Sequence, residues 1–189
     1  MLNQYSFQHK YQAGTTLIEV LVTIIILTFG LLGLAGLQAK VQLAEIESYQ
    51  RAQAIALLSD MAERINTNRA QAASYVVDSI GDQACADADG TLVGNDLSQW
   101  CNALRGAAEK MGGNDVGAMA GARGCITEIR AADATAGICT PAIYQVSVAW
   151  QGMNKTAAPA VSCGEGAYGV DSYRRAISTR VVLGLPGCV

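Results

Sequence analysis

Histidine is almost absent from this 189-residue chain, since its single copy, His9, lies within the first 14 residues. If that segment is removed, no Ser–His or Cys–His nucleophilic pair remains, and no zinc site that uses histidine can form. The sequence also lacks any basic run, and its formal net charge is −3, which argues against nucleic-acid binding. We therefore expect a protein that is not an enzyme and that has no metal, no cofactor and no small-molecule substrate.

Proline is absent before Pro141, and no glycine occurs between Gly36 and Gly81. The intervening segment is rich in Ala, Gln, Glu, Leu and Arg, which are strong helix formers. This composition predicts an amphipathic helix over 38–76. Its apolar residues follow a three-to-four spacing that would place them on one face against a globular part: Ile55, Leu58, Ala62, Ile65, Ala72 and Val76.

Charge is almost absent from 17–37, where Glu19 is the only ionisable residue. A helix of about 20 apolar residues spans one bilayer core. Lys10, in an N-terminal segment without acidic residues, favours a cytoplasmic N-terminus, so we expect a single-pass anchor at 15–37. A cleaved signal peptide is an alternative, because Gly33-Leu34-Ala35 resembles a cleavage site, but the apolar run is longer than such peptides have.

Three glycines interrupt the apolar run at Gly30, Gly33 and Gly36. Each costs a helix about 1 kcal/mol relative to alanine. Two interpretations stay open. The glycines could allow close packing against a neighbouring membrane helix, or they could form a flexible stretch that bends or partly unwinds.

Cysteine is absent before Cys85, and all six cysteines follow the apolar run. An even number beyond a membrane segment indicates an oxidising compartment and a disulfide framework. No C-x-x-C spacing occurs, which argues against a redox or metal site. Six cysteines allow 15 connectivities, and nothing in the sequence decides among them. The expectation adopted is sequential pairing: Cys85–Cys101, Cys125–Cys139 and Cys163–Cys188.

The remaining segment, 77–189, is predicted to form an α+β head. A capping box with Asp96 as N-cap predicts a short helix that ends near Lys110. Alternating apolar residues predict strands, and strands that follow helices favour an antiparallel sheet. The expected strands are 125–131, 143–152 and 173–183. In the second strand the apolar set should face the core: Tyr144, Val146, Val148 and Trp150.

Two motifs in this head lack the context that would give them a function. Asp87-Ala88-Asp89-Gly90 hints at a calcium loop, but the glycine offset is wrong and no glutamate closes the loop. Gly164–Gly169 matches G-x-G-x-x-G, but it precedes a predicted strand rather than a helix. A solvated turn is the favoured interpretation of the first motif, and a loose calcium site stays open.

The sequence Gly14-Thr15-Thr16-Leu17-Ile18-Glu19 resembles the type IV prepilin signature. In that family a prepilin peptidase cleaves after the glycine and N-methylates the new first residue. The resemblance implies a leader at 1–14, cleavage between Gly14 and Thr15, methylation of Thr15, and a role for Glu19 in subunit assembly. Glu19 would meet the methylated amine of an adjacent subunit. Two departures are Thr15 in place of the usual phenylalanine and Ala13 in place of the frequent lysine.

The resemblance also implies the type IV pilin fold, with a long N-terminal helix packed on a small antiparallel sheet. PilV-type minor pilins look most similar, from the leader, the stretch Arg51–Arg64 and the strand containing Val146, Val148 and Trp150. Such a subunit would be held in the inner membrane with its head in the periplasm, would help to prime pilus assembly and would sit at the filament tip.

The implied partners are other minor pilins, the major pilin, prepilin peptidase and the inner-membrane assembly platform. Within the family, the alternative is a minor pseudopilin of type II secretion. Outside it, the alternative is a secreted or membrane-tethered binding module, in which Glu19 would have no role.

Overall fold

The computed structural model describes residues 14–107, 110–112, 114, 115, 117 and 119–188. The predicted leader, including His9 and Lys10, lies outside these residues except for Gly14. The chain forms two compact units, with their boundary between Gln42 and Leu43. The second unit contains every strand of the described residues, and four of these strands form the antiparallel sheet predicted for an α+β head.

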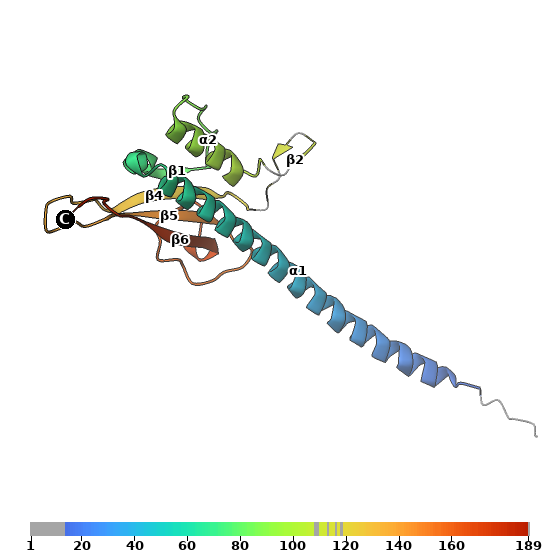
Figure 1. The fold of residues 1–189 in the computed structure, drawn as a ribbon. Coiled ribbons are helices and arrows are strands. Elements are labelled where there is room, and N and C mark those ends of the chain that lie inside the picture. Colours follow the sequence, from blue (N-terminus) through green and yellow to red (C-terminus); the bar gives the residue numbers. More distant parts are fainter. Residues whose placement is uncertain (1–13, 108–109, 113, 116, 118, 189) are drawn as a thin grey trace, which may run out of the picture. The chain divides into compact units, whose positions relative to one another are not determined.

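The first helix, α1, runs over Leu17–Thr67 (Figure 1). Within the second unit, its buried residues follow one stripe along the helix: Gln50, Ala54, Leu58, Met61 and Ile65. The predicted stripe was therefore partly wrong. Leu58 and Ile65 are buried, but Ile55 is 48% exposed, because Ala54 and Met61 occupy the positions that face the sheet.

The helical segment also ends earlier than predicted. A separate 3-10 helix, η1, follows at Arg69–Tyr75, and Gln71 within it has non-helical backbone angles (φ −113°, ψ 18°). Ala72 and Tyr75 of η1 are buried, whereas Val76 is 42% exposed. The chain thus changes direction between α1 and η1, and this change places Tyr75 in the core.

The main sheet has four antiparallel strands in the order β1-β4-β5-β6. They are β1 (Val77–Ile80), β4 (Arg123–Arg130), β5 (Ala142–Gln151) and β6 (Arg174–Leu183). The three predicted strands are confirmed within one or two residues. β1 was not predicted, and neither was the small hairpin of β2 (Lys110–Met111) and β3 (Asn114–Asp115).

One face of β5 supplies the centre of the core. Tyr144, Val146, Val148 and Trp150 are all buried, as predicted, and they cluster with the buried stripe of α1. The opposite face is covered as well. There Ala149 packs in a second cluster with Cys125 and Cys163, beneath the connection from β5 to β6.

The second helix, α2, runs over Leu92–Leu104 and is capped by Thr91, whose hydroxyl accepts a 3.0 Å hydrogen bond from the Gly94 amide. The prediction that Asp96 caps this helix was wrong, because Thr91 begins the helix one turn earlier. Asp96 instead lies inside α2 and is buried. Trp100 of the same helix is fully buried.

The disulfides join Cys85 to Cys101, Cys125 to Cys163 and Cys139 to Cys188. The first is the predicted pair, and the predicted pairs Cys125–Cys139 and Cys163–Cys188 were wrong. Strand register explains why. Cys125 lies opposite Ser147 in the middle of β5, where the β5–β6 connection brings Cys163.

Cys139 precedes β5 and lies at the other end of the sheet. There Ala142 pairs with Leu183, so the C-terminal segment that carries Cys188 passes close to it. Antiparallel pairing therefore separates Cys125 from Cys139 although they are close in sequence.

Candidate functional site

The helix start places the predicted cleavage bond in irregular backbone. Residues 14–16 are exposed and lie outside any helix, and α1 begins at Leu17. The Thr16 carbonyl accepts hydrogen bonds from the amides of Glu19 (3.0 Å) and Val20 (3.2 Å). The Thr16 hydroxyl lies 3.4 Å from the Glu19 amide, as in a weak N-cap. A peptidase would thus find the Gly14–Thr15 bond accessible, just before the helix.

The first unit presents a continuous apolar surface. Its large side chains are exposed, among them Leu17 (84%), Phe29 (72%) and Leu32 (71%). α1 is the one helix among the described residues whose length and composition would allow it to cross a membrane. The hydroxyls of Thr23 and Thr28 each donate a 2.8 Å hydrogen bond to the carbonyl three residues earlier. These polar groups are therefore satisfied within the helix, as a bilayer requires.

Glu19 is the only ionisable residue of 17–37 and interrupts this apolar surface. It lies in the first turn of α1, and among the described residues its carboxylate has no hydrogen-bond or ion-pair partner. A carboxylate at the first turn is favoured by the helix dipole, but within a bilayer it still requires a counter-charge. The geometry thus leaves Glu19 available to a group from another molecule.

The three glycines of the apolar run lie in unbroken helix. A Cβ atom placed at Gly30, Gly33 or Gly36 would meet no atom within 4 Å in the described structure. Each therefore leaves a small indentation on an exposed helix surface. A bend or local unwinding at this stretch stays a prediction.

The comparisons with known proteins concern this segment. The family model for the prokaryotic N-terminal methylation motif matches residues 9–35. The N-terminus is prepilin-like. The match spans the predicted cleavage bond, Glu19 and most of the apolar run, and the long helix with an α+β head is consistent with a pilin fold. No curated protein and no solved structure gives a significant match to the chain.

Such a prepilin-like chain would be expected to associate with a membrane and with pilus or secretion machinery.

The head contains polar clusters that sequence patterns did not reveal. In the first cluster, Asp96 accepts hydrogen bonds from Arg64 (Nη1–Oδ1 2.6 Å) and from the Tyr75 hydroxyl (2.5 Å). Burial raises the pKa of Tyr75, and the bond to Asp96 raises it further. Burial lowers the pKa of Arg64, but the hydrogen bonds to Asp96 and Asp60 outweigh burial and raise it.

In the second cluster, Arg174 at the start of β6 is only 2% exposed. It forms a two-bond ion pair with Asp171 (2.6 and 2.9 Å). Its remaining donors reach the carbonyls of Pro159 (3.1 Å), Cys163 (3.1 Å) and Val161. The hydrogen bond from Arg174 lowers the pKa of Asp171. One guanidinium thereby fixes the long β5–β6 connection on the outer face of the sheet.

The two motifs without a clear context have structural explanations here. Asp89 accepts hydrogen bonds from the amide (2.8 Å) and hydroxyl (2.6 Å) of Thr91, so it supports the start of α2. It borders a cavity of about 540 Å³ beside the Cys85–Cys101 disulfide. Within the described ranges no three His, Cys, Asp or Glu side chains gather as a metal site. The stretch 164–169 forms turns between β5 and β6.

Proposed function

We propose that this chain is the precursor of a minor pilin of a type IV pilus, of the PilV type, with a structural rather than an enzymatic role. The observation that carries the proposal is the methylation motif at residues 9–35, combined with an exposed apolar helix that begins directly after the predicted cleavage bond. The α+β head with three disulfides supports it, since disulfides are stable outside the cytoplasm.

In this proposal, prepilin peptidase removes the leader 1–14 and methylates the amino group of Thr15. Residues 15–37 hold the subunit in the inner membrane and pack against other subunits. The segment 38–76 connects this anchor to the head, 77–189, in the periplasm. Glu19 binds the methylated amine of an adjacent subunit, because two opposite charges in one membrane layer relieve each other's desolvation cost.

The proposed partners are other minor pilins, the major pilin and the inner-membrane assembly platform. The subunit would help to prime assembly and would then occupy the tip of the filament. A subunit with this role acts through its surfaces, and therefore its function should depend on contacts rather than on a catalytic group.

The first test is the intact mass and N-terminal sequence of the protein extracted from the membrane of its native cell. We expect a chain that starts at N-methylated Thr15. A chain that starts at Met1 would indicate a plain anchor, and one that starts after about Ala35 or Ala39 would indicate a signal peptide. Either result would overturn the proposal in favour of a tethered or secreted binding module.

A minor pseudopilin of type II secretion is the second candidate, because pseudopilins share the same processing and the same N-terminal motif. Deletion of the gene distinguishes the two systems. Loss of surface pili with normal protein secretion supports the pilus, whereas loss of secretion with normal pili supports the pseudopilin.

A further inference from the structure

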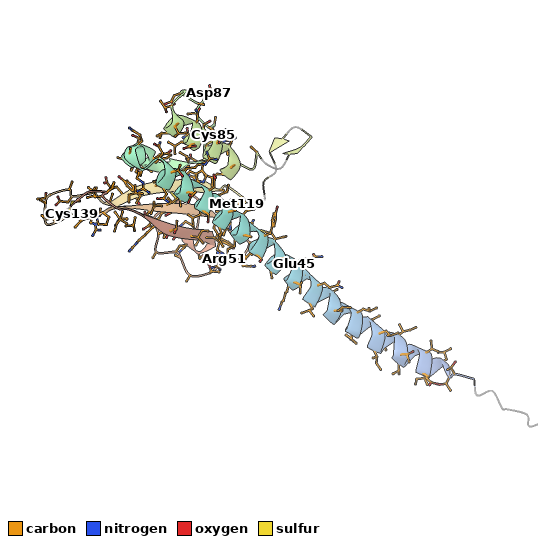
Figure 2. All side chains as sticks on the ribbon, in the orientation of Figure 1. Glu45, Arg51, Cys85, Asp87, Met119 and Cys139 are labelled. Carbon is orange, nitrogen blue, oxygen red and sulfur yellow. A yellow bond between two sulfur atoms is a disulfide. The ribbon has the colours of Figure 1, made fainter. Side chains whose placement is uncertain are left out.

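A small cleft lies between α1 and the paired ends of β5 and β6, entirely within the second unit. Glu47, Ser48 and Arg51 of α1 form one wall, and Trp150 and Arg175 form the other, around about 280 Å³. A second hollow of about 260 Å³ shares Arg51, Trp150 and Arg175 with it. Figure 2 labels Arg51 where α1 passes the ends of the strands.

Arg175 serves as a fixed wall of this cleft. Its Nη2 atom donates to Glu47 (3.2 Å) and to the Asn154 carbonyl (2.7 Å), and its Nη1 atom donates to the Thr156 hydroxyl (2.7 Å). Glu47 also accepts a 3.3 Å hydrogen bond from the Asn154 amide. The negative charge of Glu47 is therefore already balanced by Arg175 and lies in the wall of the cleft.

Arg51 is left unbalanced by this arrangement. It follows Glu47 by one helical turn, the spacing at which an arginine usually pairs with a glutamate. Arg175 has taken that glutamate, and Arg51 has no hydrogen bond or ion pair with any other described residue. The cleft thus holds one free guanidinium above a wall formed by the indole of Trp150.

The chemistry of the cleft selects its ligand. A guanidinium fork binds a carboxylate or a phosphate through two parallel hydrogen bonds. The Trp150 ring, with Ala157 and Pro159 of the adjoining hollow, suits a short apolar stem that carries such a group. Asp and Glu carry their carboxylate on one or two methylene groups, which is a stem of this kind. An acidic side chain of another protein fits best.

We propose that this cleft, with Arg51 as its anchor, receives an Asp or Glu side chain from a neighbouring pilin-like subunit during assembly. The inference rests on the proposed function, since it requires that the head meets other subunits. It concerns a contact of the head, separate from the pairing of Glu19 with the methylated amine in the membrane.

The test compares Arg51→Glu with Arg69→Glu in the full-length protein in its native cell. Arg69 is a matched control, because it is also exposed and also has no bonded partner among the described residues. We expect Arg51→Glu to reduce the amount of subunit in sheared filaments about tenfold relative to Arg69→Glu. Arg51→Lys keeps the charge but not the two-bond fork and should show an intermediate loss, and Arg51→Gln should show a larger one. The variants should keep the wild-type melting temperature in detergent, as expected of a surface change.

Equal incorporation of Arg51→Glu and Arg69→Glu would overturn the proposal. A second result would also overturn it: inorganic phosphate stabilises the detergent-solubilised wild type but not Arg51→Gln, and Arg51→Glu is incorporated normally. The cleft would then bind a small free anion. Failure of the proposed function looks different, because the wild-type chain itself would be neither cleaved at Gly14 nor present in filaments.

Discussion

The Tyr75 hydroxyl donates a 2.5 Å hydrogen bond to the Asp96 carboxylate inside the head. Arg64 binds the other carboxylate oxygen at 2.6 Å. Asp96 of α2 therefore links three elements, because it binds Arg64 at the end of α1 and Tyr75 of the 3-10 helix η1. A fully buried tyrosine usually requires such a partner for its hydroxyl, and Asp96 requires donors for a charge that is shielded from water.

Replacement of Tyr75 by phenylalanine tests this relationship. The change leaves Asp96 without one donor, so we expect the free energy of unfolding to fall by about 1–3 kcal/mol. Urea unfolding followed by circular dichroism would measure it. Tyr173→Phe is the control, because the Tyr173 hydroxyl forms no hydrogen bond within the described residues. Equal stability of the two variants would show that the hydrogen bond contributes little.

The Asp171–Arg174 ion pair predicts a dependence of stability on pH. Since its hydrogen bond to Arg174 lowers the folded-state pKa of Asp171, the pair's contribution is complete above the ordinary aspartate pKa of about 3.9. The contribution is lost as the pH falls through the lower folded-state value. Asp171→Asn should therefore be less stable than wild type at pH 7, and the difference should disappear in acid.

Unfolding midpoints measured between neutral pH and strong acid would check this expectation. Asp78→Asn provides the control, since Asp78 is exposed and has no bonded partner in the described part of the chain. A constant difference between Asp171→Asn and wild type across this range would contradict the assignment.

The disulfide connectivity can be tested by mapping the unreduced protein. Trypsin cleaves after Arg130, Lys155 and Arg180, so Cys125, Cys139, Cys163 and Cys188 fall on separate peptides. We expect the peptide with Cys125 to be joined to that with Cys163. Recovery of a Cys163–Cys188 pair would contradict the strand register. Replacing Cys125 and Cys163 together by alanine should cost about 4 kcal/mol of stability in the chain-entropy estimate.

Glu19→Ala tests the pairing proposed in the membrane. The variant should insert and be cleaved after Gly14 like the wild type, because the apolar run is unchanged. Its incorporation into filaments should fall about tenfold, which corresponds to about 1.4 kcal/mol. Blots of sheared pili and of membranes would separate assembly from processing. Normal incorporation would show that Glu19 has no assembly role.

Much of this fold could be predicted from local patterns. The alternation along β5 identified its buried face, because a strand places successive side chains on opposite sides. The motif around Gly14 and Glu19 was equally local, and it led to the segment that the family model matches. Helix composition indicated a long α1 but placed its end beyond Thr67. It identified only part of the buried stripe, since small residues such as Ala54 give no strong apolar signal.

The remaining features depend on long-range contacts. Arg64 and Asp96 are 32 residues apart, and only the packing of α1 against α2 brings them together. The free charge of Arg51 was harder still to predict, because it depends on a bond between Glu47 and Arg175 across 128 residues. Two of the three predicted disulfides were wrong for the same reason, since register rather than sequence distance decides which cysteines meet.

The anchor at Arg174 has a consequence for how this head could diversify. Apart from Asp171, its partners are main-chain carbonyls at Pro159, Val161 and Cys163, which every amino acid carries. The guanidinium therefore fixes the backbone of the loop through contacts that do not depend on the side chains at Pro159, Val161 and Cys163. Exposed positions along this loop can therefore change in sequence without changing the path of its backbone.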